Sequence, residues 1–545
     1  MKASKQKHFT RLCTLFLMSA LILSGCTATG TLSAQGETDV TTSPNTESNA
    51  ESNSESNSES NSDSPEYSTF FSEGSVHEIR IEISDTDWSD ILANPEAEEY
   101  HTANITVDGQ TATNVGFRTK GNSSLKSVAS SDSDRFSFRI KLSEYVEDQE
   151  LLGLDEFVLN NMFSDASYMR EYLSYKVMGE AGLKVPLASY VNVYVNDELF
   201  GFYLMVEAID DSYLNRAFGD NEGNLYKQES GSTLLPEADG SYDSYEQKNG
   251  DDESKEDIKS LIKTLDEMPE GEKGDIESVL DVESALKYIA ANTVLENYDS
   301  YNGSFAQNYY LYNSNGTFTV IPWDFNMAFG GFQGGILSEI DIDEPLSGTT
   351  MEKVPLIQKL LAVDEYKERY YEIVQSYVDI LSDFETEVTD LAQDIRSYVD
   401  SDPSKFVTIE QFDLNTTYQE GGETEANAAG KGMMGGNMGG LPMDGELPPI
   451  GTLPNDAQRP EMPQNGERPE KGQMPQNGQM PQNGQVPRNG QVPRNDDDEA
   501  ITGATMNIPE GGMNRGGMDL TGSSASLINI MNARIENLKT QLASK

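Results

Sequence analysis

Two long tracts of low sequence complexity confine the folded part of this chain. Residues 26–66 consist mainly of Ser, Asn, Thr and Glu, and Glu51–Ser62 repeats Glu-Ser-Asn-Ser three times. Residues 421–522 are rich in Gly, Pro, Met, Asn and Gln. Such compositions bury too little apolar surface to offset the entropy lost when a chain is ordered. We therefore expect a disordered stalk and a disordered insertion, with folded structure restricted to 67–420 and to 523–545.

A short N-terminal leader precedes Cys26. Four basic residues precede an apolar stretch, Leu12–Leu23, that is too short to span a bilayer as a helix. The small residues Ser24 and Gly25 give a peptidase access to the backbone before the Cys26 thiol, which accepts a diacylglyceryl group. This resembles the lipobox of bacterial lipoproteins; an ordinary secretory signal with a chance cysteine is the alternative. We expect a signal peptide over 1–25 and a lipid anchor at Cys26 on the outer face of the membrane.

The charge balance excludes some partners. The chain carries 92 acidic and 38 basic residues, a formal net charge of −54. Such a surface repels nucleic acid and anionic lipid headgroups, so we expect neither as a partner. The two cysteines are Cys13 in the leader and Cys26, which leaves the folded part without a disulfide or a thiolate metal site. Three histidines are too few for a multi-histidine zinc site, and no Gly-x-Ser-x-Gly hydrolase motif occurs.

The pattern of apolar residues predicts an α+β protein. Residues 67–206 read mostly as sheet, with a strand over 76–83 and tight hairpin turns at Asp108-Gly109 and Asn196-Asp197. Asp165 looks like the N-cap of a helix from Ala166 to Ala181.

Residues 207–420 read as mostly helical. Asp281 should cap a helix that runs to about Asn297, a hairpin should follow over 309–321, and helices dominate from Met351 to about Val399. The spacing of apolar residues over the last 23 residues predicts an amphipathic helix with one apolar face. We expect that helix to pack back on this helical part, although a coiled-coil partner is the alternative.

Two strand segments carry cations in a form that suits phosphate. In the first, a strand runs into a turn that holds two cations, a glycine and hydroxyl groups, and backbone N–H groups with Arg and Lys bind phosphate well. The second segment, Arg139–Lys141, places both cations on one strand face, so Lys141 could reach a phosphate while Glu171 of the predicted helix holds it. A basic strand end and a solvated strand face are the plainer interpretations. The residues of the first segment are Arg118, Lys120, Gly121, Asn122 and Ser123.

Two acidic segments could supply a base and a metal ligand. Asp299 lies in Asn297–Asn302, after a predicted helix, and a carboxylate on such a loop can take a hydroxyl proton. Asp324 follows a predicted strand among aromatic residues and glycines, as a magnesium ligand does. The plainer interpretations are Asx-turns and a turn cap, and Trp323 is best explained by core packing.

Taken together and in order, these segments resemble the CotH family, the spore coat protein H kinases, which are atypical secreted protein kinases. The resemblance covers about residues 70–410 and the final helix. It rests on Arg118-x-Lys120-Gly121-Asn122-Ser123-Ser124, Met169-Arg170-Glu171-Tyr172, Leu199-Phe200-Gly201-Phe202-Tyr203, Gly219-Asp220, Gly223-Asn224-Leu225-Tyr226-Lys227, Asn308-Tyr309-Tyr310-Leu311-Tyr312 and Pro322-Trp323-Asp324.

The resemblance implies a two-lobed, kinase-like fold, with a β-rich N-lobe over 67–206 and a mostly helical C-lobe over 207–420. ATP and Mg²⁺ or Mn²⁺ would lie between the lobes, and the acceptors would be Ser or Thr residues of exported or coat proteins. The implied roles are phosphate binding for Arg118, Lys120, Gly121, Asn122 and Ser123, a Lys141–Glu171 pair on the phosphates, and a hinge beside adenine over Val206-Glu207-Ala208. Asp299 would be the catalytic acidic residue near the acceptor hydroxyl, and Asp324 with Asn308 or Asn302 would ligate the metal.

The chain departs from ordinary protein kinases in ways that keep a second function open. It has no Gly-x-Gly-x-x-Gly and no His-Arg-Asp motif, and Asn326 stands where an acid is often found. A kinase fold with weak or no catalysis, organising a coat or the cell envelope, is therefore the alternative. An adhesin is a third interpretation, to which the stalk and the acidic surface point.

Overall fold

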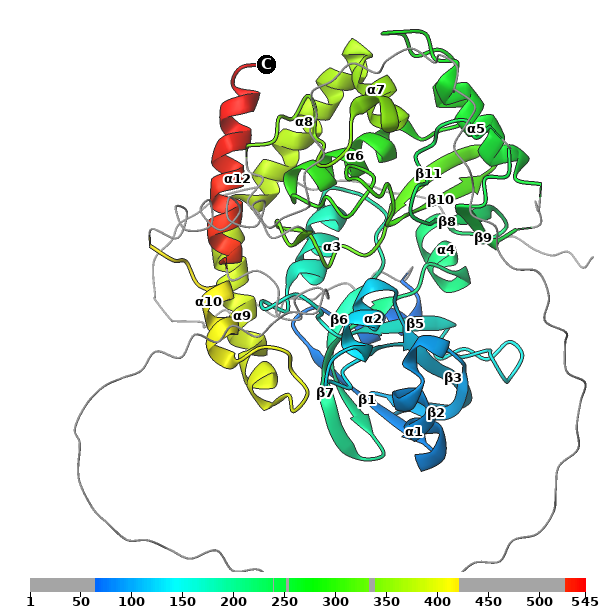
Figure 1. Ribbon diagram of the computed structural model, residues 1–545, viewed down its shortest axis with the longest axis vertical. Coiled ribbons are helices and arrows are strands. Elements are labelled where there is room, and N and C mark those ends of the chain that lie inside the picture. The colour runs from blue at the N-terminus through cyan, green and yellow to red at the C-terminus, as the bar shows by residue number, and fades with distance from the viewer. Residues whose placement is uncertain (1–63, 239, 251–253, 333–338, 421–524) are drawn as a thin grey trace, which may run out of the picture. The chain divides into compact units, whose positions relative to one another are not determined.

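A computed structural model describes residues 64–545 except 239, 251–253, 333–338 and 421–524 (Figure 1). The predicted signal peptide, the lipidation site at Cys26, nearly all of the predicted stalk and the predicted insertion lie outside the described residues. Within the described part, no helix combines the length and the apolar character that a membrane crossing requires.

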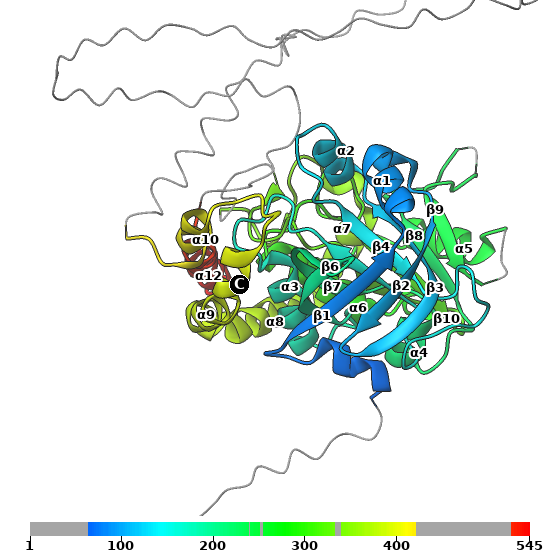
Figure 2. The same cartoon turned by 90° about the horizontal axis from the view of Figure 1, so that it is seen from below.

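Seven strands of the described chain form a closed barrel in the order β1-β2-β3-β4-β5-β7-β6. Figure 2 labels β1–β4, β6 and β7 of this barrel. Sequence patterning predicted the sheet but not its closure, which comes from parallel pairing of β1 with β6 between segments more than 100 residues apart. The interior is apolar, and Phe117 of β3 stacks on Phe138 of β4 with ring centroids 4.9 Å apart. The strands are β1 (Val76–Ile83), β2 (His101–Val107), β3 (Gln110–Lys120), β4 (Ser137–Lys141), β5 (Glu156–Asn160), β6 (Ala188–Val195) and β7 (Glu198–Glu207).

Both predicted hairpin turns of the barrel are confirmed. Asp108 and Gly109 have φ angles of 45° and 84°, and Asn196 and Asp197 have φ angles of 50° and 69°. Two successive left-handed residues match the right-handed twist of the flanking strands, and Asp, Asn and Gly tolerate that conformation best.

The rest of the described chain joins a four-stranded sheet to a set of helices. The sheet order is β11-β10-β8-β9, and the predicted hairpin is its β10–β11 pair. Its strands are β8 (Asn224–Gln228), β9 (Tyr245–Asn249), β10 (Tyr309–Ser314) and β11 (Thr317–Pro322). The helices are α1 (Asp85–Ala93), α2 (Ser123–Ala129), α3 (Arg170–Glu180), α4 (Asp211–Phe218), α5 (Glu256–Asp266), α6 (Val282–Val294), α7 (Pro355–Leu361), α8 (Asp364–Ile380), α9 (Phe384–Ser401), α10 (Ile409–Thr416) and α12 (Leu527–Leu542).

Two helix boundaries differ from the prediction for a local reason. The helix predicted from Ala166 begins at Arg170, because Tyr168 adopts a left-handed φ angle of 61° that no α-helix accepts. The Asp165 carboxylate instead accepts the backbone N–H of Arg170 at 2.9 Å.

The second boundary that differs is the end of helix α6, which stops at Val294 rather than near Asn297. Its start agrees with the prediction, because Asp281 is the N-cap. Its first turn is closed by the Asp281 carboxylate, which accepts the backbone N–H of Ser284 at 3.1 Å. Glu296, with a φ angle of 50°, turns the chain away from the helix axis.

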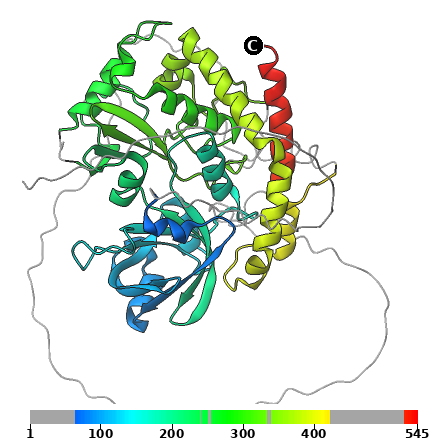
Figure 3. The same cartoon turned by 180° about the vertical axis from the view of Figure 1, so that it is seen from behind.

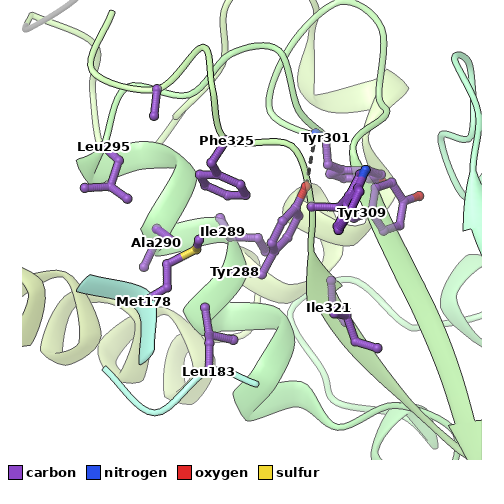
Figure 4. Close-up of a cluster of buried hydrophobic side chains, with 14 of the residues drawn as sticks. Met178, Leu183, Tyr288, Ile289, Ala290, Leu295, Tyr301, Tyr309, Ile321 and Phe325 are labelled. Atoms are coloured by element: carbon purple, nitrogen blue, oxygen red, sulfur yellow. Dashed lines mark hydrogen bonds between the residues drawn. The ribbon is translucent and has the colours of Figure 1, made fainter. Parts of the chain in front are cut away.

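One shared core anchors α3, α6 and the strands of the second sheet (Figure 4). Tyr288 of α6 packs near Tyr309, with ring centroids 5.8 Å apart, and its hydroxyl accepts the backbone N–H of Tyr301. Phe325 is fully buried in the same cluster. The chain that follows α6 is thereby tied to the helix.

The C-terminal helix α12 packs against α6, α8 and α9 (Figure 3). Its apolar face is buried as the spacing predicted, and it also carries Arg534, which has no exposed surface. The Arg534 guanidinium donates to the carbonyl of Thr293 at 2.9 Å and to that of Ile340 at 3.0 Å. A helix more than 100 residues after α10 therefore supports the end of α6.

Candidate active site

A polar cavity of about 720 Å³ is lined by residues of both sheets. The barrel contributes one wall from β3, β4 and β5, and the second sheet contributes β8, β10 and the segment after β11. Ten of the residues that we predicted from sequence line this cavity: Arg118, Lys120, Gly121, Asn122, Ser123, Lys141, Glu171, Asp299, Asn308 and Asp324.

Strand register gathers cations on the barrel wall. Arg118 and Lys120 are two residues apart on β3, so their side chains point to the same face of the strand. Arg118 lies directly opposite Arg139 of β4. Arg118 and Arg139 form ion pairs with Glu98 and Glu156. The barrel wall therefore carries several basic groups, while the cavity lining as a whole contains ten acidic and six basic residues. An anion in the cavity would need this basic wall, or a bound cation, to offset the carboxylates.

The turn after β3 completes this wall. Gly121 has a φ angle of 123°, and a Cβ built there would meet the Ser124 hydroxyl at 3.0 Å, so the bend favours glycine. Asn122 precedes α2, which begins at Ser123. The backbone of this turn thus faces the cavity beside Lys120.

A buried hydrogen-bonded chain connects Lys120 to α3. The Lys120 ammonium donates to Asn160 Oδ1 at 2.9 Å, and Asn160 Nδ2 donates to Glu171 Oε2 at 2.7 Å. Burial lowers the pKa of Lys120, while Asp324 and Glu171 act in the opposite direction. Burial and then the charge of Asp324 raise the pKa of Glu171, while Lys120 lowers it. The lysine and both carboxylates therefore share one electrostatic environment.

Tyr175 extends the chain to Asp324. Its hydroxyl donates to Glu171 Oε1 at 3.2 Å and accepts the backbone N–H of Asp324 at 3.0 Å. Asp324 has a φ angle of 56°, so the backbone bends sharply just after β11 and turns this residue into the cavity.

The predicted pairing of Lys141 with Glu171 is wrong. The Lys141 ammonium lies 3.5 Å from the Glu144 carboxylate, and the Lys141 side chain is 41 % exposed. Lys120 takes the expected position instead, through Asn160. Both lysines are on the same side of neighbouring strands, and the position of α3, which sequence spacing does not reveal, decides which one approaches Glu171.

Asp299 lies on the loop after α6 and is held by two amides. Gln307 Nε2 donates to its Oδ1 at 2.7 Å, and Asn308 Nδ2 donates to its Oδ2 at 3.2 Å. Burial, followed by the charge of Asp324, raises the pKa of Asp299 to about 6, and the two amides oppose that rise. Such a carboxyl is ionised at neutral pH and basic enough to accept a hydroxyl proton.

The acidic loops carry oxygen donors that suit a divalent cation. Asp299 and Asp324 repel one another across the cavity, and a bound cation would relieve that repulsion. Asn308 and Asn326 add amide oxygens beside them. No group of three or more His, Cys, Asp or Glu residues with metal-binding geometry occurs in the described ranges, so phosphate oxygens and water would have to complete a shell.

Two predicted site residues lie elsewhere. The Glu207 carboxylate is fully buried, where it pairs with Arg216 at 2.5 Å and accepts the Tyr67 hydroxyl at 2.6 Å. Of the predicted hinge, Ala208 does line the cavity. Asn302 is also fully buried and donates to the carbonyl of Pro345 at 3.0 Å, because the loop turns it into the core.

The sequence analysis did not identify Asn160 as a site residue, and it assigned Trp323 to the hydrophobic core. Asn160 is a polar residue at the end of the buried strand β5, and that position was the available signal. Trp323 is 6 % exposed and lies edge-on to Tyr310, with centroids 5.8 Å apart, as packing predicted. It nevertheless contributes to the cavity wall.

Comparison with known proteins places the chain in a family. A family model described as CotH kinase protein matches residues 117–426, which is more than half of the chain. The chain therefore belongs to the CotH family. It is also 28 % identical over 277 residues to the inner spore coat protein H of Bacillus subtilis (strain 168), a match that covers 48 % of this chain and 73 % of that relative.

Proposed function

We propose that this CotH-family protein is an extracytoplasmic protein kinase, held at the cell surface by a lipid on Cys26. It transfers the γ-phosphoryl group of ATP, with Mg²⁺ or Mn²⁺, to Ser or Thr residues of exported or coat proteins. The observation that carries the proposal is the Lys120–Asn160–Glu171 chain in one cavity with Asp299 and Asp324. Phosphoryl transfer requires this combination of a fixed cation, a group at the hydroxyl and a metal-binding acid.

The barrel and the helical part would act as the two lobes of a kinase-like fold. Lys120, held by Asn160 and Glu171, would contact the non-transferred phosphates of ATP. Backbone N–H groups of Gly121 and Asn122, with Arg118, would cover them. The segment after Glu207, beginning at Ala208, would face the nucleoside.

Asp299 would take the proton of the acceptor hydroxyl as its oxygen forms a bond to the γ-phosphorus. The bond from that phosphorus to the bridging oxygen then breaks, and ADP leaves with the electron pair. Gln307 and Asn308 hold the carboxylate for this role. Asp324, with Asn326 or Asn308, would hold the metal ion, which neutralises charge on the phosphates when bound.

The test uses residues 64–545, which include the compact unit Asp63–Lys545 apart from its first residue. This protein is incubated with γ-labelled ATP, Mg²⁺ or Mn²⁺ and an acceptor mixture of exported proteins. Asp299→Ala, Asp324→Ala and Lys120→Met should each reduce label transfer by roughly 10²-fold or more, since each removes a group from the reacting charges. Lys141→Met should transfer label at a rate within about tenfold of the parent, because Lys141 pairs with Glu144 and not with Glu171.

Asp197→Asn is the matched control for the acidic variants, because Asp197 is 93 % exposed. Equal labelling by parent, Asp299→Ala and Asp324→Ala proteins would refute the proposal. An unlabelled reaction with no thermal shift from ATP and metal would also refute it and favour a binding or structural role in a coat.

A further inference from the structure

Lys227 brings a cation to the cavity from the second sheet. It lies on β8 and lines the cavity with Lys120, which comes from the barrel. Its register partner on β10 is Tyr310, and the Tyr310 ring lies edge-on to Trp323, the residue before Asp324. Strand pairing thus fixes the base of the Lys227 side chain near the segment that carries Asp324.

The charge of Lys227 acts on Lys120 across the cavity. The pKa of Lys120 is lowered first by burial, is raised by Asp324 and Glu171, and is then lowered by Arg139 and Lys227. Two ammonium groups that face one cavity repel until an anion lies between them. Lys120 is already connected to the buried Glu171 carboxylate through Asn160. The Lys227 ammonium is therefore not needed to balance the charge of Glu171.

Lys227 can change partner at little cost. Its ammonium lies 2.7 Å from Glu229, two residues along the chain, and the two side chains are 33 % and 50 % exposed. A solvent-exposed ion pair of this kind is worth about 0–1 kcal/mol. A phosphate oxygen in the cavity offers a stronger, charge-assisted contact, so the side chain would leave Glu229 when one binds.

We infer that Lys227 contacts the phosphoryl group undergoing transfer, while Lys120 holds the phosphates that stay on the nucleotide. This inference rests on the proposed kinase function and adds a catalytic residue to it. The transferred group spreads negative charge over its three equatorial oxygens, and a mobile ammonium can follow that charge toward the acceptor.

The test separates binding from transfer with the protein of residues 64–545. Lys227→Met should lower kcat by about 10²-fold, because one charge on the transferring group is lost, while the KM for ATP changes less than about threefold. Lys227→Arg should recover part of kcat, since it keeps the charge. Lys263→Met is the matched control, because Lys263 of α5 is 72 % exposed and pairs with Glu267, just past the end of that helix.

A second readout does not depend on turnover. The affinity for ADP with Mg²⁺ should be the same in the parent and in Lys227→Met. Addition of aluminium fluoride, which imitates the transferring group, should tighten ADP binding in the parent by tenfold or more and leave the variant unchanged.

The outcomes distinguish the two proposals. A parent that transfers phosphate, together with a Lys227→Met protein of unchanged kcat and unchanged fluoride effect, overturns the inference and keeps the kinase. A Lys227→Met protein that loses ADP affinity as strongly as kcat also overturns it, because Lys227 would then be a ground-state binding group. A parent that neither binds ADP nor transfers phosphate overturns both.

Discussion

Burial sets the chemistry available to Asp299. A carboxyl with a pKa of about 6 holds its proton more tightly in the folded protein than in the unfolded chain, where the pKa is 3.8. The protonated Asp299 carboxyl therefore makes its full contribution to the free energy of unfolding below pH 3.8, and this contribution is lost as the pH rises through about 6. At pH 8 the ionised carboxylate costs the fold on the order of 3 kcal/mol.

This linkage predicts that removal of the Asp299 charge stabilises the protein. Asp299→Asn should raise the free energy of unfolding by roughly 1–3 kcal/mol at pH 8 without added metal, and by much less at pH 4. Urea unfolding at the two pH values measures the difference. A gain that is equal at both pH values, or a loss at pH 8, would show that burial does not strain this carboxylate.

At the scale of the element, the loop after α6 is the part that determines the site. It carries Asp299, whose backbone carbonyl accepts Asn308 Nδ2, and the backbone N–H of Tyr301 donates to the Tyr288 hydroxyl of α6. Gly303 closes this loop, where a Cβ would lie 1.8 Å from the carbonyl oxygen of Tyr298. No rotamer change relieves a clash with backbone, so the loop itself must move.

Gly303→Ala should therefore disturb both stability and activity. We expect a loss of about 1–3 kcal/mol or more in the free energy of unfolding, together with a fall in phosphate transfer. Gly316→Ala is the control, because a Cβ there meets no atom within 4 Å and only its left-handed φ of 92° adds strain. Thermal unfolding of the two variants gives the comparison, and equal losses would contradict a steric cause.

At the scale of the whole molecule, one buried ion pair ties the barrel to the helices. Arg135, just before β4, lies 2.6 Å from Asp402, just after α9, and neither side chain has exposed surface. The Arg135 guanidinium also donates to the carbonyl of Phe202 and lies 4.6 Å from the Tyr203 ring centroid. It thus touches β7 and the segment after α9 at once.

Removal of either partner should leave an uncompensated buried charge. Arg135→Met and Asp402→Leu should each lower the free energy of unfolding by roughly 3–5 kcal/mol, and the double variant should lose less than the sum of the two. Urea unfolding of the four proteins completes the cycle. Strict additivity would show that the pair does not act as a unit.

The local sequence determined those features whose causes lie within a few residues. Asp108-Gly109 and Asn196-Asp197 fixed two hairpins, because their backbone preferences are intrinsic to the residues. Asp281 fixed the start of α6 in the same way, through one short-range hydrogen bond. Residues 117–124 predicted a strand that runs into a turn, and Gly121, with a φ angle of 123°, forms that turn.

The tertiary structure decided what depends on distant partners. Closure of the barrel needs β1 beside β6, and the choice of Lys120 over Lys141 needs α3 beside β5. Glu207 and Asn302 lie outside the cavity for the same reason, since each is held in the core by a residue far along the chain, Tyr67 and Pro345 respectively. Alternation assigns a side chain to a face of a strand, but contact across a cavity depends on how separate elements pack, which local spacing does not encode.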